Sequence, residues 1–216
     1  MRSLVSAVVL LAGVSGASAQ LVNAFTETFD AGSEGWLAGT FSPLDFDASG
    51  FVSSTADISA AGPFGLTLFR GHDDFDASGD AFVGDYLTSG ITTVSFDIRH
   101  DYTDALDFAL RIATPGNSPG FAIELSESVF FGEWTTVTFD LDPNNPLYTP
   151  EGPAGFGFFA GVMTDVGNLQ ISLTPPAGLP VGTFVTFDLD NAKITPSPGA
   201  FAPFCIGLLA AARRRR

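Results

Sequence analysis

Residues 91–99 read ITTVSFDIR, and this stretch decides the fold class. Apolar side chains stand at every second position, Val94, Phe96 and Ile98. The residues around and between them are polar: Thr93, Ser95, Asp97 and Arg99. Because successive side chains of a β-strand point to opposite faces, a period of two predicts a strand with one buried and one solvated face.

The same alternation recurs along the chain. Residues 134–142 read WTTVTFDLD and residues 183–190 read TFVTFDLD. Further strands are predicted over 25–29, 51–58, 66–69, 105–113, 121–125, 156–163 and 169–173, with no convincing amphipathic helix among them. Segments rich in Gly, Pro, Asn and Asp separate these runs. About ten short, half-solvated strands indicate an all-β fold, an antiparallel β-sandwich of the jelly-roll type.

The charge of the chain is distributed unevenly. Net charge is −15, yet Arg2 and the arginines at 213–216 supply five of the nine basic residues. All 24 acidic residues lie between Glu27 and Asp190, where only three basic residues stand, and Lys193 follows shortly after. Such a field repels phosphate backbones, so no nucleic-acid partner is expected. It favours divalent cations such as Ca²⁺, although high charge also simply maintains solubility.

Residues 1–19 have the three parts of a secretory signal peptide. Arg2 gives a positive start, residues 4–14 are apolar, and Ala17-Ser18-Ala19 forms a small-x-small cleavage site. We therefore expect export, with a mature chain that begins near Gln20.

Residues 196–216 predict a second targeting segment. Pro196-Ser197-Pro198 precedes an uncharged run over 200–212, and the chain ends in Arg213, Arg214, Arg215 and Arg216. A helix of this run would span only ~20 Å, less than the ~30 Å hydrocarbon core of a bilayer. The arginines would stop translocation at the cytoplasmic side. The tail is thus expected to make a transient membrane contact.

This order of Pro-x-Pro, short apolar run and arginine cluster resembles the PEP-CTERM sorting signal of Gram-negative bacteria. The resemblance implies export, an exosortase-type processing enzyme as partner, and delivery to the cell envelope or exopolysaccharide matrix. Ser197 stands where the usual motif has Glu. A plain C-terminal membrane anchor is the alternative.

The body, residues 20–195, is expected to be one domain. ETFDAGSEGW at 27–36 and FDLDNAKI at 187–194 resemble the first and last strands of galactose-binding-like jelly rolls, which include carbohydrate-binding modules and laminin-type domains. The resemblance implies that these strands lie side by side and that Glu27 and Asp190 hold a structural calcium. The alternative is that Asp190 belongs to a plain polar strand face.

A second candidate calcium site lies in the sequence DDFDASGDAFVGD. Its oxygen-bearing residues follow a loosened EF-hand spacing: Asp74, Asp76, Ser78 and Asp85. Asp85 stands at the last position, where the EF-hand loop has a bidentate Glu, so coordination would be poorer. The alternative is an acidic turn between strands.

Catalytic motifs are weak. His72 and His100 each adjoin an aspartate, but no nucleophile-elbow motif accompanies them. Carboxylate pairs able to cleave glycosidic bonds arise by chance in so acidic a chain. Tyr148, in a loop rich in Pro and Asn, is the best candidate for an exposed ring that stacks on a sugar.

Together these features predict an exported, non-enzymatic envelope or matrix protein that binds or organises polysaccharide, with Ca²⁺ as a structural cofactor. Two alternatives stay open. One is a secreted glycan-active enzyme of similar fold, and the other is a structural surface protein without a ligand.

Overall fold

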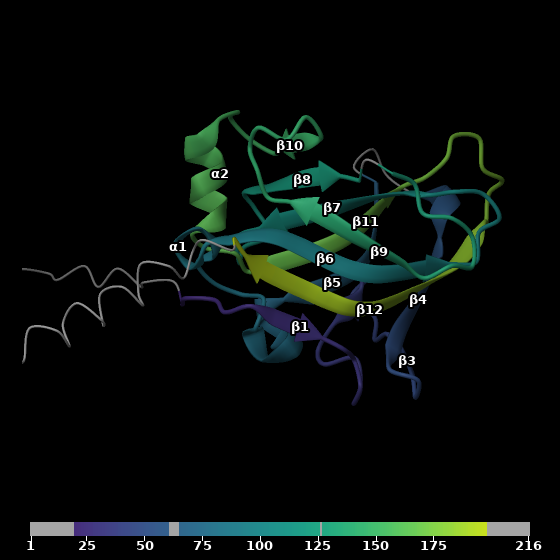
Figure 1. Ribbon diagram of the computed structural model, residues 1–216. Coiled ribbons are helices and arrows are strands. Elements are labelled where there is room, and N and C mark those ends of the chain that lie inside the picture. Colours follow the sequence, from purple (N-terminus) through teal and green to yellow (C-terminus); the bar gives the residue numbers. More distant parts are fainter. Residues whose placement is uncertain (1–19, 61–64, 126, 198–216) are drawn as a thin grey trace, which may run out of the picture.

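Two antiparallel β-sheets pack face to face in the computed structural model, which describes residues 20–60, 65–125 and 127–197 (Figure 1). The predicted all-β sandwich of the jelly-roll type is confirmed. The signal-peptide prediction with Ala17 and Ala19, and the tail prediction from Pro198 to the terminal arginines, lie outside the described residues.

The first sheet is built around its longest strand, β12 (Phe184–Pro196). Along the main path the order is β3 (Asp45–Asp47), β4 (Phe51–Asp57), β12, β6 (Ile91–His100) and β9 (Thr135–Asp140). The short β1 (Phe25–Glu27) also pairs with β12, and Glu27 stands opposite Ala192. The first and last strands therefore lie side by side, as the jelly-roll resemblance implied.

The second sheet has a simple linear order. It runs β10 (Tyr148–Pro150), β8 (Gly120–Glu124), β7 (Asp107–Ala113), β11 (Asn168–Thr174), β5 (Leu66–His72) and β2 (Leu37–Ala38). All of its strand pairs are antiparallel. The strands predicted from alternation in both sheets are confirmed, with ends that differ by a few residues.

The core lies between the two sheets. Val94, Phe96 and Ile98 of β6 are buried, and so are the alternate residues of β7, Phe108, Leu110 and Ile112. Trp36 is fully buried and packs edge-on against Phe29 and Phe82. A fully buried large aromatic ring removes about 150–250 Å² from water, so buried rings such as Phe96, Phe108 and Phe187 stabilise the sandwich. The sequence has one cysteine, so no disulfide within the chain contributes.

One predicted strand is wrong. Residues 156–163 form a helix, α2 (Phe156–Met163), which caps one end of the sandwich (Figure 1). Its buried residues are Phe159, Val162 and Met163, at the i, i+3, i+4 spacing of a helix face. The expectation that the body has no helix fails at this segment, because the intervening residues are glycine, alanine and phenylalanine and show no polar face.

The remaining helical pieces are short: η1 (Ile58–Ala60), η2 (Asp73–Phe75), η3 (Ala77–Asp80) and α1 (Tyr86–Ser89). Within the described ranges, none of the helices has the length and apolar character needed to cross a membrane. The fold continues to Ser197, whose N–H donates to Gly90 O at 2.9 Å. Pro196, predicted to begin the tail, is thus the last residue of β12.

Candidate ligand-binding groove

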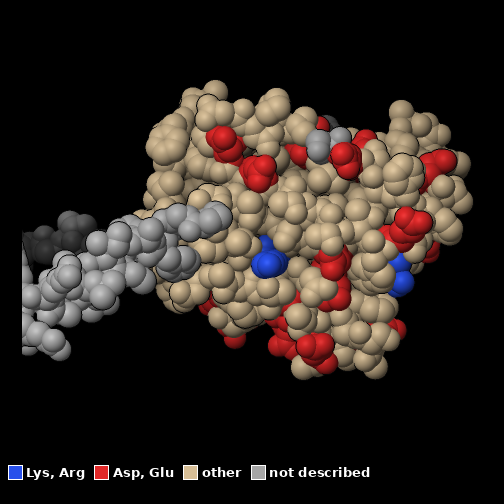
Figure 2. All heavy atoms as spheres, viewed as in Figure 1, with Lys and Arg blue, Asp and Glu red and all other residues tan. Residues whose placement is uncertain are grey.

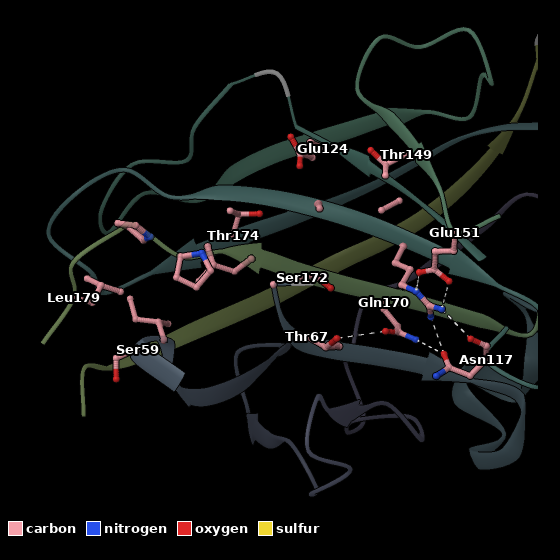
Figure 3. A pocket seen from close by; sticks show the side chains of 18 of the residues that line it. Ser59, Thr67, Asn117, Glu124, Thr149, Glu151, Gln170, Ser172, Thr174 and Leu179 are labelled. Carbon is pink, nitrogen blue, oxygen red and sulfur yellow. Dashed lines mark hydrogen bonds and ion pairs between the residues drawn. The ribbon is translucent and has the colours of Figure 1, made fainter. Parts of the chain in front are cut away.

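A groove of about 760 Å³ lies on the second sheet (Figure 3). Its floor comes from β5, β7, β8 and β11. Ser59 and Leu179 stand at one end, whereas Asn117, Gln170 and Glu151 gather at the other. The two ends differ in chemistry, because charged groups are concentrated at the second end.

Alternation in β11 decides which residues face the groove. Leu169, Ile171 and Leu173 are buried. Gln170 and Ser172, at the positions between them, line the groove. The groove face is therefore the polar face of a strand whose apolar face is core.

Register between strands arranges the groove residues in rows. Gln170 pairs with Arg70 of β5 on one side and with Arg111 of β7 on the other. The row continues to Ala122 of β8 and Thr149 of β10. A parallel row contains Thr67, Ser172, Ala109 and Glu124. Because Ala122 stands next to Arg111 in the first row, and Ser172 and Ala109 form the middle of the second, the floor stays open beside the longer polar side chains.

A β-bulge in β5 places two polar residues on the same face. The register shifts between Ile171 and Ser172, so that Ile171 pairs with Phe69 and Ser172 with Thr67. Leu68 is left without a partner, and both Leu68 and Phe69 are fully buried. Such an extra residue re-aims the strand. Thr67 therefore stands on the groove face with Arg70, three residues later.

The charged end of the groove is held by Arg111. Its Nη2 donates to Glu151 Oε2 at 2.7 Å and its Nε to Glu151 Oε1. Its Nη1 donates to Asn117 Oδ1 at 2.7 Å. Gly120 permits this arrangement, because a Cβ at that position would lie 2.9 Å from Glu151 Oε2. Asn117 has a φ of 59°, a left-handed conformation that asparagine tolerates.

Gln170 lies between two guanidinium groups. Its carboxamide is 2.7 Å from Arg70 Nη1 and 2.8 Å from Arg111 Nη1, distances that suit the amide oxygen as acceptor. Figure 3 shows Gln170 on the floor with Asn117 and Thr67 beside it. The amide thus connects the groove to Arg70, which lies beside Gln170 on the neighbouring strand β5.

Arg70 is the most unusual group near the groove. Only 7% of the residue is exposed, and its guanidinium lies over the ring of Phe41, 4.5 Å from the centroid. Its Nε is buried without a hydrogen-bond partner in the described part of the chain. Burial lowers the pKa of Arg70, and the nearby positive charge of Arg111 lowers it further. Sequence reasoning missed Arg70, Arg111 and Gln170, because their proximity depends on strand register.

The arrangement suits a ligand rich in hydroxyl groups. Hydroxyls, amides, guanidinium groups and carboxylates all face one open floor: Ser59, Thr67, Thr149, Ser172, Thr174, Asn117, Gln170, Arg111, Glu124 and Glu151. These supply both donors and acceptors of hydrogen bonds. Several are already positioned by bonds to one another, so they would need little ordering when a ligand binds.

The predicted calcium ligands Glu27 and Asp190 lie in the first sheet, away from this groove. Glu27 is buried, and its Oε1 accepts from Phe29 N at 2.9 Å. Burial raises the pKa of Asp190, and the negative charges of Asp97 and Asp30 raise it further, against a backbone hydrogen bond from Asn191 that lowers it. The structure therefore adds Asp30 and Asp97 to the acidic group near Asp190. Both were missed, because in sequence they stand as ordinary polar residues.

The residues of the EF-hand-like loop have other partners. Ser78 Oγ accepts a hydrogen bond of 2.9 Å from Trp36 Nε1. Asp85 caps the N-terminus of α1, and its Oδ1 accepts from Thr88 N at 2.8 Å. Asp74 and Asp76 are exposed. Two of the four predicted ligands thus have structural roles, and calcium at this loop stays a prediction.

Among the described residues, one group of three has possible metal-ligating atoms within 4.8 Å of one another: His72, Asp73 and Asp74. The His72 ring is buried, and its Nδ1 accepts from Asp74 N at 3.0 Å. His100 is buried too, with its ring against Phe108 and Phe187. The histidines are therefore packing residues of the two sheets rather than parts of the groove.

The prediction of an exposed stacking ring at Tyr148 is wrong. The ring is half-buried and packs against Phe121 and Phe159, with centroids 5.2 and 6.0 Å away. Its hydroxyl oxygen is buried, and burial raises its pKa. The reason is that this segment is a strand, β10, which turns Tyr148 inward and places Thr149 in the groove.

Acidic side chains are scattered over the face of the sandwich crossed by β6 and β12, where basic ones are few (Figure 2). One basic residue of that sheet, Arg99, is paired with Asp188, its Nη2 2.5 Å from the Asp188 oxygen. Arg99 also lies over the rings of Trp134 and Phe51, at 4.7 and 5.3 Å from their centroids. This sheet thus has a stacked arginine of its own, but one that is neutralised.

Comparison with known proteins finds similarity at the level of the fold. A xylanase structure from Clostridium thermocellum, a CBM22-1–GH10 module pair complexed with xylohexaose, is 15% identical with a TM-score of 0.41. That match covers 80% of this chain, which spans only 28% of the xylanase structure. The L4b domain of human laminin alpha-2 is 10% identical and the Bacillus licheniformis beta-glucanase 12%, both with a TM-score of 0.44. Each of these two matches covers 82% of this chain and all of the other. No protein-family model matches the sequence, and no curated protein matches it.

Proposed function

We propose that the groove on the second sheet binds polysaccharide and that the protein is an exported, non-enzymatic component of the cell envelope or extracellular matrix. The observation that carries the proposal is the preordered polar row at its floor. Arg111, Asn117 and Glu151 are fixed by mutual hydrogen bonds beside alanine and serine residues. Hydroxyl-rich chains need such dense, rigid donors and acceptors, because each buried hydroxyl must be paired.

The size of the groove agrees with this function. Its volume of about 760 Å³ falls in the range of about 300–1,000 Å³ typical of ligand sites. Thr149 and Glu124 border it on the β8–β10 side, and Thr67 on the β5 side. A chain of sugar rings would then lie across the strands, with hydroxyls directed at the polar rows.

The two carboxylates that line the groove, Glu124 and Glu151, favour binding of a glycan without its cleavage. Glycosidic hydrolysis in most families requires one carboxylic acid that protonates the leaving group and a second carboxylate opposite it. Both oxygens of Glu151 accept from Arg111, so neither is free to deliver a proton. Glu124 then stands without a second available carboxylate in the lining of the groove.

The termini support a route to the matrix. The signal-peptide pattern of residues 1–19 and the Pro-x-Pro, apolar and arginine order of the tail are the features of an exported protein that an exosortase-type enzyme would process after transient membrane contact. Exopolysaccharide is the ligand that such a protein would meet there.

A structural Ca²⁺ at Glu27 and Asp190 is part of the proposal. Asp30 and Asp97 would bring the number of carboxylates to four, since their negative charges, after burial, raise the pKa of Asp190. Gly50 allows the loop to approach, since a Cβ there would lie 3.2 Å from Asp30 Oδ1. Calcium prefers such oxygen ligands and would offset their repulsion.

The function is tested with a matched pair of threonine variants in the full chain. Thr149 of β10 borders the groove, whereas Thr138 of β9 is exposed on the first sheet. We expect Thr149→Phe to fill the groove and weaken retention on immobilised exopolysaccharide by about tenfold or more, a loss of about 1.4 kcal/mol of binding free energy. Thr138→Phe should bind like the unchanged protein.

Equal retention of the two variants would overturn the assignment of the groove. Reducing ends are measured in the same samples. Their release by the unchanged protein, and its loss in Glu124→Gln, would replace the binding function by a glycosidase.

A further inference from the structure

The positive charge of the body is concentrated beside the groove. Between Glu27 and Asp190 the sequence has 24 acidic residues but only three arginines. Two of these, Arg70 and Arg111, stand in one row of the second sheet with Gln170 between them. Bringing like charges together and burying one of them is unfavourable by itself. In so acidic a protein, this arrangement requires a compensating interaction.

The carboxylates present do not supply it. Glu151 pairs with Arg111, and Asp188 pairs with Arg99 on the other sheet. In the described part of the chain, Arg70 has no carboxylate within ion-pair distance. It is 7% exposed, and its Nε is a buried donor without a partner. Buried guanidinium groups are normally paired and hydrogen-bonded. The row of Arg70, Gln170 and Arg111 beside the groove therefore has one positive charge in excess.

We propose that the polysaccharide is acidic and that a carboxylate of a uronate-type sugar binds at Gln170, beside Arg70 and Arg111. The inference rests on the polysaccharide-binding function of the groove and specifies its ligand. A guanidinium group presents a planar fork of N–H donors that matches a carboxylate. An anion at Gln170 would lie next to both forks, because the amide is within 2.8 Å of each.

The negative charge of the protein opposes general binding of polyanions, so an acidic glycan can bind only through a close contact with these arginines. The net charge of −15 repels anionic chains at long range, and that repulsion is screened by salt. A partly buried contact with Arg70 and Arg111 is screened much less. Retention of an acidic glycan should therefore persist at physiological salt, which distinguishes it from diffuse attraction to a basic surface.

The test compares a polyuronate with its carboxyl-reduced, neutral counterpart, titrated into the full chain with a chelator present. The chelator removes calcium bridges between the two acidic partners. We expect the polyuronate to bind about tenfold to a hundredfold more tightly, the range given by a charged hydrogen bond. Equal affinity for both polymers would overturn the acidic ligand but leave polysaccharide binding intact. Binding of neither by a protein that circular dichroism shows to be folded in chelator would overturn the function of the groove itself.

Arginine variants locate the contact. Arg70→Gln should reduce the preference for the polyuronate to about threefold or less, since the excess charge is lost. Arg99→Gln is the matched control, because Arg99 is also stacked on an aromatic ring but lies on the first sheet. A preference that survives Arg70→Gln, or that disappears equally in Arg99→Gln, would contradict the site.

A second variant covers the case in which Arg70→Gln fails to fold. Gln170→Glu places a carboxylate between the two guanidinium groups within the chain itself. We expect a higher melting temperature and loss of polyuronate binding together, because the internal carboxylate takes the position of the ligand. A lower melting temperature in Gln170→Glu would show that the cluster has no excess positive charge. Binding of a sulfated glycan as tight as that of the polyuronate would overturn the assignment to carboxylate.

Discussion

Trp36 Nε1 donates a hydrogen bond of 2.9 Å to Ser78 Oγ, so a buried ring near the start of the fold is tied to the acidic turn 42 residues later. The ring itself is fully buried, and it lies against Gly71, where a Cβ would come within 3.0 Å of it. This contact gives the hydroxyl of Ser78, one of the predicted ligands of the second calcium site, a partner within the fold. It also gives a direct test of the packing.

Trp36→Phe should lower the free energy of unfolding by about 1–3 kcal/mol, because it removes the hydrogen bond and leaves the Ser78 hydroxyl without its donor. Urea unfolding followed by circular dichroism measures the change. Trp134→Phe is the control, since 41% of Trp134 is exposed, and it should change stability by about 0.5 kcal/mol or less. Equal losses in the two variants would contradict the packing of Trp36.

The raised pKa of Asp190 predicts that the stability of the calcium-free protein depends on pH. Its pKa in the folded protein is raised by burial and then by Asp97 and Asp30. Because its pKa is raised by folding, the folded state favours protonated Asp190. The contribution of this group to the free energy of unfolding is therefore fully present below the unfolded pKa and is lost as the pH rises through the folded pKa. In chelator, Asp190→Asn should therefore be more stable than the unchanged protein at neutral pH, by about 1 kcal/mol at most because the group is partly solvated. The difference should vanish below the unfolded pKa, and a pH series of melting temperatures would reveal a constant difference if this account fails.

With calcium present, the unchanged protein should instead be more stable than Asp190→Asn. If Glu27 and Asp190 hold Ca²⁺, a concentration 100 times the dissociation constant stabilises the unchanged protein by about 2.7 kcal/mol. Asp190→Asn and Glu27→Gln should lose this gain, which differential scanning calorimetry measures as the shift in melting temperature between calcium and chelator. Asp74→Asn tests the second predicted site, and a loss of the shift there would favour the acidic turn instead. Unchanged melting of the native protein after confirmed metal removal would count against both sites.

Phe159 of α2 should be important for stability. Its ring packs on Phe121 at 5.2 Å and on Tyr148 at 6.0 Å, and only 3% of the residue is exposed. Phe159→Ala should therefore cost about 3–5 kcal/mol of unfolding free energy. Phe156→Ala, three residues earlier and 63% exposed, should cost about 0.5 kcal/mol or less. If Phe156→Ala is the more damaging variant in denaturant titrations, residues 156–163 do not present the helix face described above.

Sequence determined the class of the fold because alternation is a local property. The alternation in ITTVSFDIR predicts which of its side chains are buried, and the structure confirms this for Val94, Phe96 and Ile98. Local pattern failed at residues 156–163, whose sequence FGFFAGVM has no polar face but forms a helix. It failed again at Tyr148, whose orientation is fixed by pairing with β8. In both cases contacts distant in sequence overrode the local preference.

The groove belongs wholly to tertiary structure. Arg70, Arg111 and Gln170 come from three strands, and nothing in their local sequences relates them. A period of two tells which face of a strand is polar, but it does not tell which strand lies beside it or in what register. Those choices follow from the packing of the whole sandwich, and a shift of one residue would turn each of these side chains into the core. The sequence alone thus determined a two-layered, acidic β-protein and predicts targeting signals at its ends, whereas only the pairing of β5, β11 and β7 brought its scarce positive charges together.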